Sequence, residues 1–343
     1  MKMKKTLLLA TLGATTFCAT NVQADEINIY SLRQPELLAP LTAAFEEKTG
    51  IKTNVLFVKD GAIDRVASEG ENSPADVVMT VDIGRLDAAK KAGIWQPIPQ
   101  DVAANVPANF VDPEGAWVAL TARARIFYVS KDRVEAENLS YADLASDEWA
   151  GRICTRSGQH SYSIGLVASQ IAHKGEEATK EWLEGVRDNL ARKPTGNDRA
   201  QVQAIYSGEC DLAIGNTYYM GKMLTNDAEP EQKEWAASVR LVYPDAEQSK
   251  THVNVSGVVL AKNAPHEEAA KQFIEFLLSD EAQAIYAETN FEFPIMPGVE
   301  ASDLVQSWGE LKADSLPLAE IADKRDEASK LVDEVKFDEG PQN

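Results

Sequence analysis

Residues 117–130 read Trp-Val-Ala-Leu-Thr-Ala-Arg-Ala-Arg-Ile-Phe-Tyr-Val-Ser, a stretch that predicts one long extended strand. It separates two series of alternating strands and helices, the second of which covers about 151–243. A second extended stretch, 252–262, follows that series and leads into a strongly helical one, 266–288. This order predicts an α/β chain that leaves a first unit, builds a second and then returns to the first.

The first series of elements indicates the same fold class. Its strands and helices alternate, and glycines stand where two of the helices are expected to end. The expected strands are 27–30, 51–58 and 75–81, and the expected helices are 37–48 before Gly50, 62–68, and 85–92 before Gly93. We therefore expect α/β wrapping with parallel strands.

Residues 1–24 have the features of a secretory signal peptide. A lysine-rich start precedes an apolar stretch, 6–17, and Val22-Gln23-Ala24 is a cleavage site of the small-x-small type. The apolar stretch is too short to span a membrane. Cys18 would suggest a lipoprotein, but the residues before it are a poor lipidation context. We expect an exported protein that is not inserted in the membrane, with 319 residues in two domains.

The charge of the chain excludes two classes of partner. Removal of the leader takes away three lysines and no acid, so 31 basic groups then face 54 acidic ones and the net charge moves from −20 to −23. A surface this acidic repels nucleic acid and anionic lipid. Acidity alone does not specify a cation as ligand, because it also keeps an exported protein soluble.

Two adjacent tyrosines, Tyr218 and Tyr219, are the most informative candidate ligands. They follow the apolar run 210–217, which reads as a short buried strand, so they fall at the carboxyl end of that strand, where open α/β sheets hold ligands. Neighbouring residues of a regular strand point to opposite faces. Both phenols can therefore reach one ligand only if the strand gives way to a turn or a helix start. Two convergent phenols indicate a hard, highly charged cation such as ferric iron.

At this point the chain resembles the periplasmic ferric-iron-binding proteins of bacterial iron import systems. The resemblance covers nearly the whole mature chain. It is carried by Ile27-Asn28-Ile29-Tyr30-Ser31, Ser73-Pro74-Ala75-Asp76-Val77-Val78, Gly151-Arg152-Ile153-Cys154 and Asn216-Thr217-Tyr218-Tyr219. It implies the two-lobed, type II fold of periplasmic binding proteins, in which two crossover strands join α/β lobes around a ligand cleft. The implied lobes are 25–122 with 253–300, and 123–252 with 301–343.

The resemblance also implies the metal ligands. The family uses the tyrosine pair together with a tyrosine from a Ser/Gly-rich loop of the second lobe, which here is 157–163 and contains Tyr162. Two alternatives stay open: Tyr162 could cap or pack at a helix start, and one tyrosine of the pair could pack in the core. The other tyrosines lie in apolar contexts and are expected in the core, namely Tyr30, Tyr128, Tyr141, Tyr206, Tyr243 and Tyr286.

The first lobe departs from one branch of the family. Relatives there often carry a His-Tyr or His-x-Glu pair soon after the first strand, but this chain has Gln34-Pro35 and then Glu36. Gln34 is a weak ferric ligand, and Glu36 is a secondary candidate. Three tyrosinates leave half of an octahedral shell open, so the sequence predicts a synergistic anion such as carbonate, held by Arg33 and Arg125.

Other residues are secondary candidates for the cleft. Arg123 is predicted on the same strand face as Arg125, so the sequence does not separate the two as anion clamps. Asp82 follows the strand 75–81, and Asn216 precedes the tyrosine pair. His160 is expected to be a surface residue rather than a ligand. The last residues, 338–343, look disordered.

Cys154 and Cys210 remain after removal of the leader. An even number of cysteines in an oxidising compartment favours a disulfide, here between the roots of the two tyrosine-bearing loops.

The expected function is that of a monomeric periplasmic protein that carries ferric iron to an inner-membrane ABC permease. The sequence contains no nucleophile elbow and no phosphate-binding glycine loop, so catalysis is not expected. One alternative is a carrier of a small anion or an organic cation. An anion would bind through Arg33, Arg125, Asn216 and backbone amides of the Tyr162 loop. An alternative of another class is a secreted metal-dependent hydrolase, which would need a carboxylate or histidine metal site.

Overall fold

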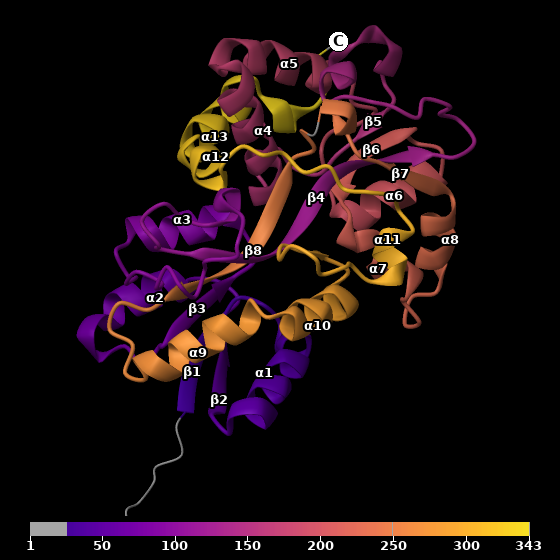
Figure 1. The fold of residues 1–343 in the computed structure, drawn as a ribbon. Coiled ribbons are helices and arrows are strands. Elements are labelled where there is room, and N and C mark those ends of the chain that lie inside the picture. Colours follow the sequence, from indigo (N-terminus) through magenta and orange to yellow (C-terminus); the bar gives the residue numbers. More distant parts are fainter. Residues whose placement is uncertain (1–25, 249, 343) are drawn as a thin grey trace, which may run out of the picture.

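The computed structural model describes residues 26–248 and 250–342, so the predicted leader and Asn343 lie outside the described residues. The chain forms two α/β lobes, one above and one below the central strands β4 (Val118–Ser130) and β8 (Val253–Leu260) (Figure 1). Both strands were predicted as crossovers, and both predictions are confirmed. No helix in the described ranges is long and apolar enough to cross a membrane.

The first lobe is built on a mostly parallel sheet. Strand β1 (Glu26–Ser31) pairs in parallel with β2 (Lys52–Phe57) and with β3 (Val77–Thr80), and β3 pairs antiparallel with β8. The helices of this lobe are α1 (Pro35–Thr49), α2 (Ala62–Glu69), α3 (Ile83–Lys91), α9 (Glu267–Leu277) and α10 (Asp280–Asn290). Gly50 ends α1 at φ 75°, a conformation that favours glycine.

The second lobe is built around the other half of β4. That half pairs antiparallel with β6 (Leu212–Asn216) and β7 (Val239–Val242), and β6 pairs in parallel with β5 (Ile153–Cys154). The remaining elements of this lobe are α4 (Ser161–Lys174), α5 (Glu176–Asp188), α6 (Asp198–Tyr206), α7 (Tyr218–Leu224), α8 (Glu231–Ala237), α11 (Asp303–Gln306), α12 (Leu318–Asp323) and α13 (Arg325–Glu334). Strand β9 (Phe293–Pro294) pairs antiparallel with the first-lobe half of β4, at Thr121 and Ala122.

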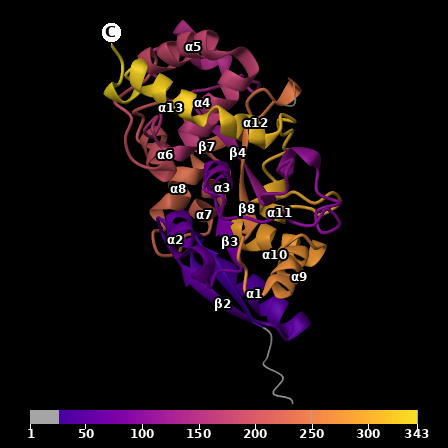
Figure 2. The ribbon, with the colours of Figure 1, turned by 90° about the vertical axis from the view of Figure 1, so that its left-hand side faces the viewer.

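Strand β4 changes partners at the junction of the lobes. It pairs with β8 as far as Ala124, and from Arg125 onward it pairs with β6. All 13 of its residues are buried, so the strand belongs to the cores of both lobes. Figure 2, which views the molecule from its left-hand side, shows α3 below α4 and α12, and these helices are in contact. The two lobes therefore also touch beside the crossover strands.

The stretch expected to be strongly helical, 266–288, forms two helices, because the Ser279 hydroxyl caps the second one by accepting a bond from the amide of Ala282. Two other sequence-based expectations are wrong. The segment from Asp338 to Gln342 was expected to be disordered, but it packs in a defined position. Asp338 holds it there by accepting hydrogen bonds from the amide of Gly158 and the hydroxyl of Ser157. Tyr206 is 47% exposed rather than in the core.

The predicted disulfide between Cys154 and Cys210 is confirmed. The two Cα atoms lie 5.9 Å apart, and both cysteines are buried. Cys154 ends β5, and Cys210 stands two residues before β6. The bridge therefore ties together the roots of the segments that lead to Tyr162 and to Tyr218.

Replacing both cysteines by serine is expected to lower the free energy of unfolding by about 2–4 kcal/mol, because the unfolded chain regains the entropy of an open loop of 56 residues. Urea unfolding followed by circular dichroism measures the change. The unmodified protein in excess reductant is the matched control and should lose a similar amount. An unfolding midpoint that does not move in either sample would contradict a stabilising bridge.

Candidate functional site

A cleft of ≈ 320 Å³ lies between the lobes at the carboxyl ends of strands from both. Leu32 and Arg33 follow β1, Val81 follows β3, and Tyr218 follows β6. The residues that line the cleft are Leu32, Arg33, Gln34, Leu37, Val81, Arg123, Tyr162, Arg199, Tyr218, Tyr219, Lys222, Asn290 and Glu292. This is where an α/β sheet is expected to hold a ligand.

Three tyrosines converge in this cleft. The hydroxyl oxygens of Tyr162 and Tyr218 lie 3.3 Å apart, and the ring centroids of Tyr218 and Tyr219 lie 4.2 Å apart. Strand β6 ends at Asn216 and helix α7 begins at Tyr218, so the strand gives way before the pair, as convergence requires. Tyr162 lies in the first turn of α4.

Burial disfavours ionisation of the tyrosine pair. It raises the pKa of Tyr218 well above its ordinary value, and the neighbouring phenols of Tyr162 and Tyr219 raise it further. Burial also raises the pKa of Tyr219, and the nearby Asp198 carboxylate adds to that effect. Both phenols therefore carry their protons at neutral pH.

The turn that presents the tyrosine pair is held from behind. The Tyr128 hydroxyl donates a hydrogen bond of 2.6 Å to the carbonyl of Asn216. Gly215 fits against this ring only because it has no Cβ, which would lie 2.3 Å from a Tyr128 ring carbon. The Asn216 amide donates to Asp198 Oδ2 at 2.9 Å, and its side-chain oxygen accepts from Arg125 at 3.3 Å. These residues support the site without lining it.

Arg125 is paired behind the tyrosines rather than placed in the cleft. Its guanidinium lies 3.1 Å from Asp198 Oδ2, and the other oxygen of Asp198 accepts from Arg156 at 3.0 Å. Arg156 in turn lies 5.3 Å from the centroid of the Tyr162 ring. Arg125 and Asn216, two predicted cleft residues, thus form a buried layer beneath the tyrosines.

Arg123 does line the cleft. One of its terminal nitrogens donates to the hydroxyl of Ser256 at 3.2 Å, and the other donates to the carbonyl of Val81. Its guanidinium carbon lies 5.6 Å from the centroid of the Tyr162 ring. Its positive charge therefore faces a phenol, and it has no ion pair in the described part of the chain.

Arg33 and Glu292 form a buried ion pair at the first-lobe wall. Arg33 Nη2 lies 3.0 Å from Glu292 Oε1, and the same carboxylate accepts bonds from Ser256 and Thr121. Burial alone would raise the pKa of Glu292, but Arg33 and Arg123 outweigh it and hold the pKa below the usual range. Glu292 is therefore ionised, and Arg33 is largely compensated.

Of the other predicted first-lobe residues, only one lines the cleft. Gln34 lines the cleft, and Glu36 is exposed in the first turn of α1. Asp82 does not line the cleft. It caps α3 by accepting a bond of 2.9 Å from the Gly84 amide, and it lies 3.4 Å from Arg325 of the second lobe. Asp82 therefore joins the lobes beside the cleft.

His160 was expected on the surface, but its side chain is half-buried. Its Nδ1 accepts a hydrogen bond of 3.2 Å from the amide of Tyr162 and so caps α4. Burial lowers the pKa of His160 to about 4, and Arg156 and Arg125 contribute to the shift. The neutral ring keeps this acceptor available and fixes the start of the helix that carries Tyr162.

Sequence reasoning missed three charged residues of the cleft, namely Arg199, Lys222 and Glu292. Lys222 lies one turn after the tyrosine pair on α7, with its Nζ 5.3 Å from the centroid of the Tyr218 ring. Burial lowers the pKa of Lys222, and the positive charge of Arg33 lowers it further. The helical spacing from Tyr218 to Lys222 is a signal that could have identified this lysine. Nothing local points to the other two.

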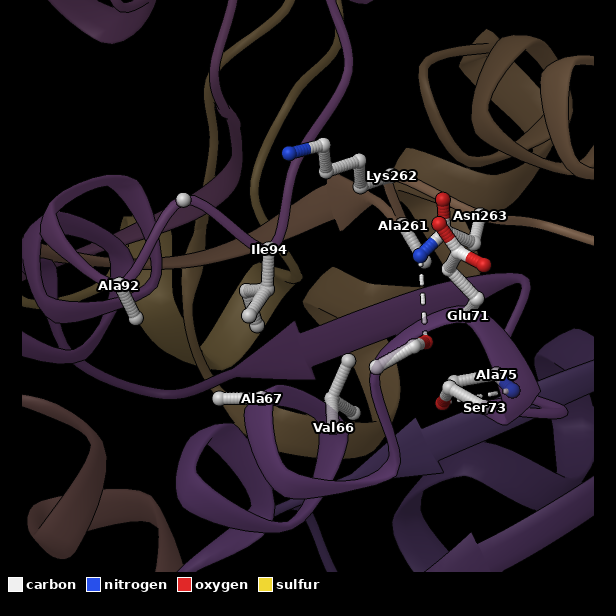
Figure 3. Close-up of a pocket in the computed structure, with 12 residues that line it drawn as sticks. Val66, Ala67, Glu71, Ser73, Ala75, Ala92, Ile94, Ala261, Lys262 and Asn263 are labelled. Carbon is white, nitrogen blue, oxygen red and sulfur yellow. Dashed lines mark hydrogen bonds between the residues drawn. The ribbon is translucent and has the colours of Figure 1, made fainter.

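A second pocket, of ≈ 270 Å³, lies at the opposite end of β3 and is lined in part by Val66, Glu71, Ser73, Lys262 and Asn263 (Figure 3). The Asn263 amide donates a hydrogen bond of 3.1 Å to the carbonyl of Gly70. Its lining contains no tyrosine and no arginine. In the described residues, no group of three or more histidine, cysteine or acidic side chains is arranged to hold a metal ion. The tyrosine-lined cleft is therefore the candidate site.

Comparison with known proteins places the chain in a family. Residues 72–311 match the family described as bacterial extracellular solute-binding protein. Iron uptake protein A1 of Synechocystis sp. is 44% identical over 316 residues, which cover 91% of this chain and 88% of the relative. The family is described by solute binding and this relative by iron uptake, and neither description is of an enzymatic reaction.

Solved structures give the same result. Ferric iron-binding protein A of Mannheimia haemolytica, in an open conformation, is 48% identical with a TM-score of 0.88, over 92% of this chain and 99% of that one. The Trichodesmium protein solved with iron and citrate ligands is 39% identical with a TM-score of 0.88, over 91% and 99% of the two chains. The chain therefore belongs to the bacterial extracellular solute-binding proteins, in the group that includes the iron-uptake and ferric-iron-binding proteins.

Proposed function

We propose that this protein binds ferric iron in the cleft between its lobes and delivers it, as the periplasmic binding component, to an inner-membrane ABC permease. The observation that carries the proposal is the convergence of Tyr162, Tyr218 and Tyr219, with two hydroxyl oxygens 3.3 Å apart. The names of the relatives support iron as the cargo. A catalytic role has no support from the cleft residues or from these relatives.

The three phenols would bind the metal as tyrosinates. The cleft lining contains no histidine, and its one carboxylate, Glu292, is engaged by Arg33. Hard oxygen anions are the donors that a trivalent cation favours, and the metal supplies the free energy that removes the phenolic protons. Three such ligands leave half of an octahedral shell for other donors.

A carbonate-type anion would complete the shell. Arg33 was predicted as one clamp, and it lines the cleft. For the second clamp the geometry favours Arg123 over Arg125, because Arg123 lines the cleft and lacks an ion pair whereas Arg125 is paired with Asp198. A guanidinium binds a planar anion through two parallel hydrogen bonds. Gln34 is a further polar contact in the same wall.

Closure of the lobes would then bury the iron. We assign the lobes as 25–122 with 253–300, and 123–252 with 301–343, with β4 and β8 as the connection between them. The residues that line this cleft come from both assigned lobes, so a ligand that contacts both walls favours the closed arrangement. The closed form would be the one that the permease recognises.

A second candidate is a carrier of a small anion that takes no metal. The observation in its favour is the set of arginine and lysine side chains in the cleft lining, Arg33, Arg123, Arg199 and Lys222. The tyrosines would then serve only as hydrogen-bond donors. The two functions differ in whether iron produces a tyrosinate signal.

Adding ferric iron and bicarbonate to the purified protein is expected to produce a broad visible charge-transfer band from tyrosinate to iron. The double variant Tyr218→Phe, Tyr219→Phe should lose the band because two of the three anionic donors are gone. The exposed Tyr206→Phe is the matched control and should keep it. A folded protein that gives no band in the absence of substitutions would refute iron binding and favour the metal-free anion carrier.

Iron affinity is expected to fall as the pH is lowered. The raised pKa values of Tyr218 and Tyr219 mean that both phenols are protonated in the free protein, so binding must release their protons. Each proton released weakens binding about tenfold per pH unit of acidification. The number of protons released on iron binding can be measured in two ways. One is competition with a chelator of known affinity between pH 5 and 8, and the other is direct counting of the released protons. An affinity independent of pH would mean that no phenol ionises.

Arg123→Gln is expected to weaken iron binding in the presence of bicarbonate by about ten- to a hundredfold, the effect of one charge-assisted hydrogen bond. The same variant should respond less to added bicarbonate, because the substitution removes an anion clamp. Arg85→Gln, a partly exposed arginine outside the cleft lining, is the control. Retention of the full bicarbonate response in Arg123→Gln would show that this arginine does not hold the anion.

A further inference from the structure

The three tyrosines of the cleft are supported in different ways. Tyr218 and Tyr219 follow β6, a strand that lies in the core and pairs with β4. Tyr162 instead follows a loop, 155–160, that connects the two-residue strand β5 to helix α4. The position of the Tyr162 hydroxyl in the cleft therefore depends on what holds this loop.

The loop rests on a segment from the far end of the chain. We call residues 325–339 the C-terminal strap, which comprises α13 and a short 3-10 helix, Phe337–Glu339. Helix α13 packs along α4 (Figure 1). Gly158 of the loop lies directly on the strap, because a Cβ atom there would lie 2.7 Å from a ring carbon of Phe337 and 2.8 Å from a methyl group of Val332. A larger residue at this position would push the loop and the strap apart.

Asp338 makes most of the polar contacts between the strap and the loop. Its Oδ1 accepts a hydrogen bond of 2.6 Å from the amide of Gly158, and its Oδ2 accepts one of 2.5 Å from the hydroxyl of Ser157. The amide of Gln159 donates to the same Oδ2 at 3.4 Å. Hydrogen bonds to a carboxylate are stronger than those between neutral groups. Two consecutive amides and one hydroxyl of the loop therefore converge on a single carboxylate.

The strap makes further hydrogen bonds to the residues around the start of α4. The Gln159 side chain exchanges two bonds with Ser329, because its Nε2 donates to the carbonyl at 2.8 Å and its Oε1 accepts from the hydroxyl at 2.8 Å. Arg325 Nη1 donates to the carbonyl of Ser161 at 3.3 Å. The strap thus holds both the loop and the residue that directly precedes Tyr162.

We propose that the C-terminal strap positions Tyr162 for the metal, with Asp338 as the principal positioning residue. This inference rests on the proposed function and adds a residue that is distant in sequence from every predicted ligand. Asp338 does not line the cleft, so it acts through the loop and not on the ligand. Without its carboxylate the amide of Gly158 loses its partner, and the loop no longer fixes the start of the helix that carries Tyr162.

Asp338 has one other role that would explain its contacts, which is to stabilise the second lobe as a whole. That role would lower the free energy of unfolding and leave the iron site of the folded protein unchanged. Positioning of Tyr162 changes the site itself. It alters the iron affinity and the charge-transfer absorbance per bound iron, which depends on the number of phenolates on the metal. Its effect also disappears when Tyr162 no longer carries a hydroxyl.

The test measures iron affinity by competition with a chelator, and absorbance per bound iron, in Asp338→Ala, Tyr162→Phe and the double variant. Asp338→Ala is expected to weaken iron binding about tenfold and to lower the absorbance toward that of Tyr162→Phe. In the Tyr162→Phe background the same substitution should change the affinity by less than about twofold. Glu339→Gln, at the exposed neighbour of Asp338 in the strap, is the matched control and should change nothing.

Two milder variants accompany the test. Asp338→Asn keeps an acceptor oxygen for the amide of Gly158 and should lose less affinity than Asp338→Ala. Gln159→Ala removes the contact with Ser329 from the loop side and should weaken iron binding in the same direction. Circular dichroism checks that each variant is folded, and these two variants carry the test if Asp338→Ala does not fold.

The outcomes separate this inference from the proposed function. Unchanged affinity and absorbance in the folded variants of Asp338 and Gln159 would overturn the positioning role. A loss of affinity that is equally large in the Tyr162→Phe background would also overturn it, because the strap would then act by another route. In both cases the band of the unmodified protein would leave iron binding intact. The absence of a band in the unmodified protein would instead overturn the proposed function itself.

Discussion

The continuity of β4 through both lobes is the constraint on which the rest of the structure depends. The strand pairs with β8 up to Ala124 and with β6 from Arg125, so one unbroken backbone belongs to two cores. Because β6 is aligned on β4, the turn that follows it brings Tyr218 to the junction of the lobes. Because β8 and β9 also pair with β4, Ser256 and Glu292 reach the same place from the first lobe. The cleft therefore forms where these strand pairings bring residues of the two lobes together.

The charged groups of the cleft are in an electrostatically unfavourable environment when no ligand is bound. Burial raises the pKa of Tyr218 and lowers that of Lys222, so both groups are poorly stabilised in their charged forms. In the proposed site, the opposite charges of a metal and an anion would relieve both at once and so would couple the two ligands to each other. Behind them, Asp198 pairs with Arg125 and Arg156 and keeps the tyrosine turn in position. In this supporting layer both carboxylate oxygens of Asp198 are used, while Arg125 Nε and Nη2 and Asn216 Nδ2 are buried without a hydrogen-bond partner among the described residues.

The sequence predicted the parts of this site that depend on local order. Tyr218 and Tyr219 directly follow a buried strand, so their place at its carboxyl end could be predicted, and the crossover strands were long enough to be identified. Arg123 and Arg125 were placed together on one face of β4, but the strand changes partners between 124 and 125, so each arginine contacts a different lobe. Glu292 and Arg199 come from distant segments, and only tertiary pairing brings them to the cleft. The C-terminal segment looked disordered because it is polar, but Asp338 is fixed by the loop before Tyr162.

The most direct test of a tyrosinate iron site is a crystal structure of the iron-loaded protein with anomalous data collected at the iron absorption edge. The account predicts a single strong anomalous peak in the cleft, bonded to the hydroxyl oxygens of Tyr162, Tyr218 and Tyr219, with anion density beside Arg123. A peak bound by carboxylates or histidines elsewhere on the chain, with the three phenols unligated, would contradict it.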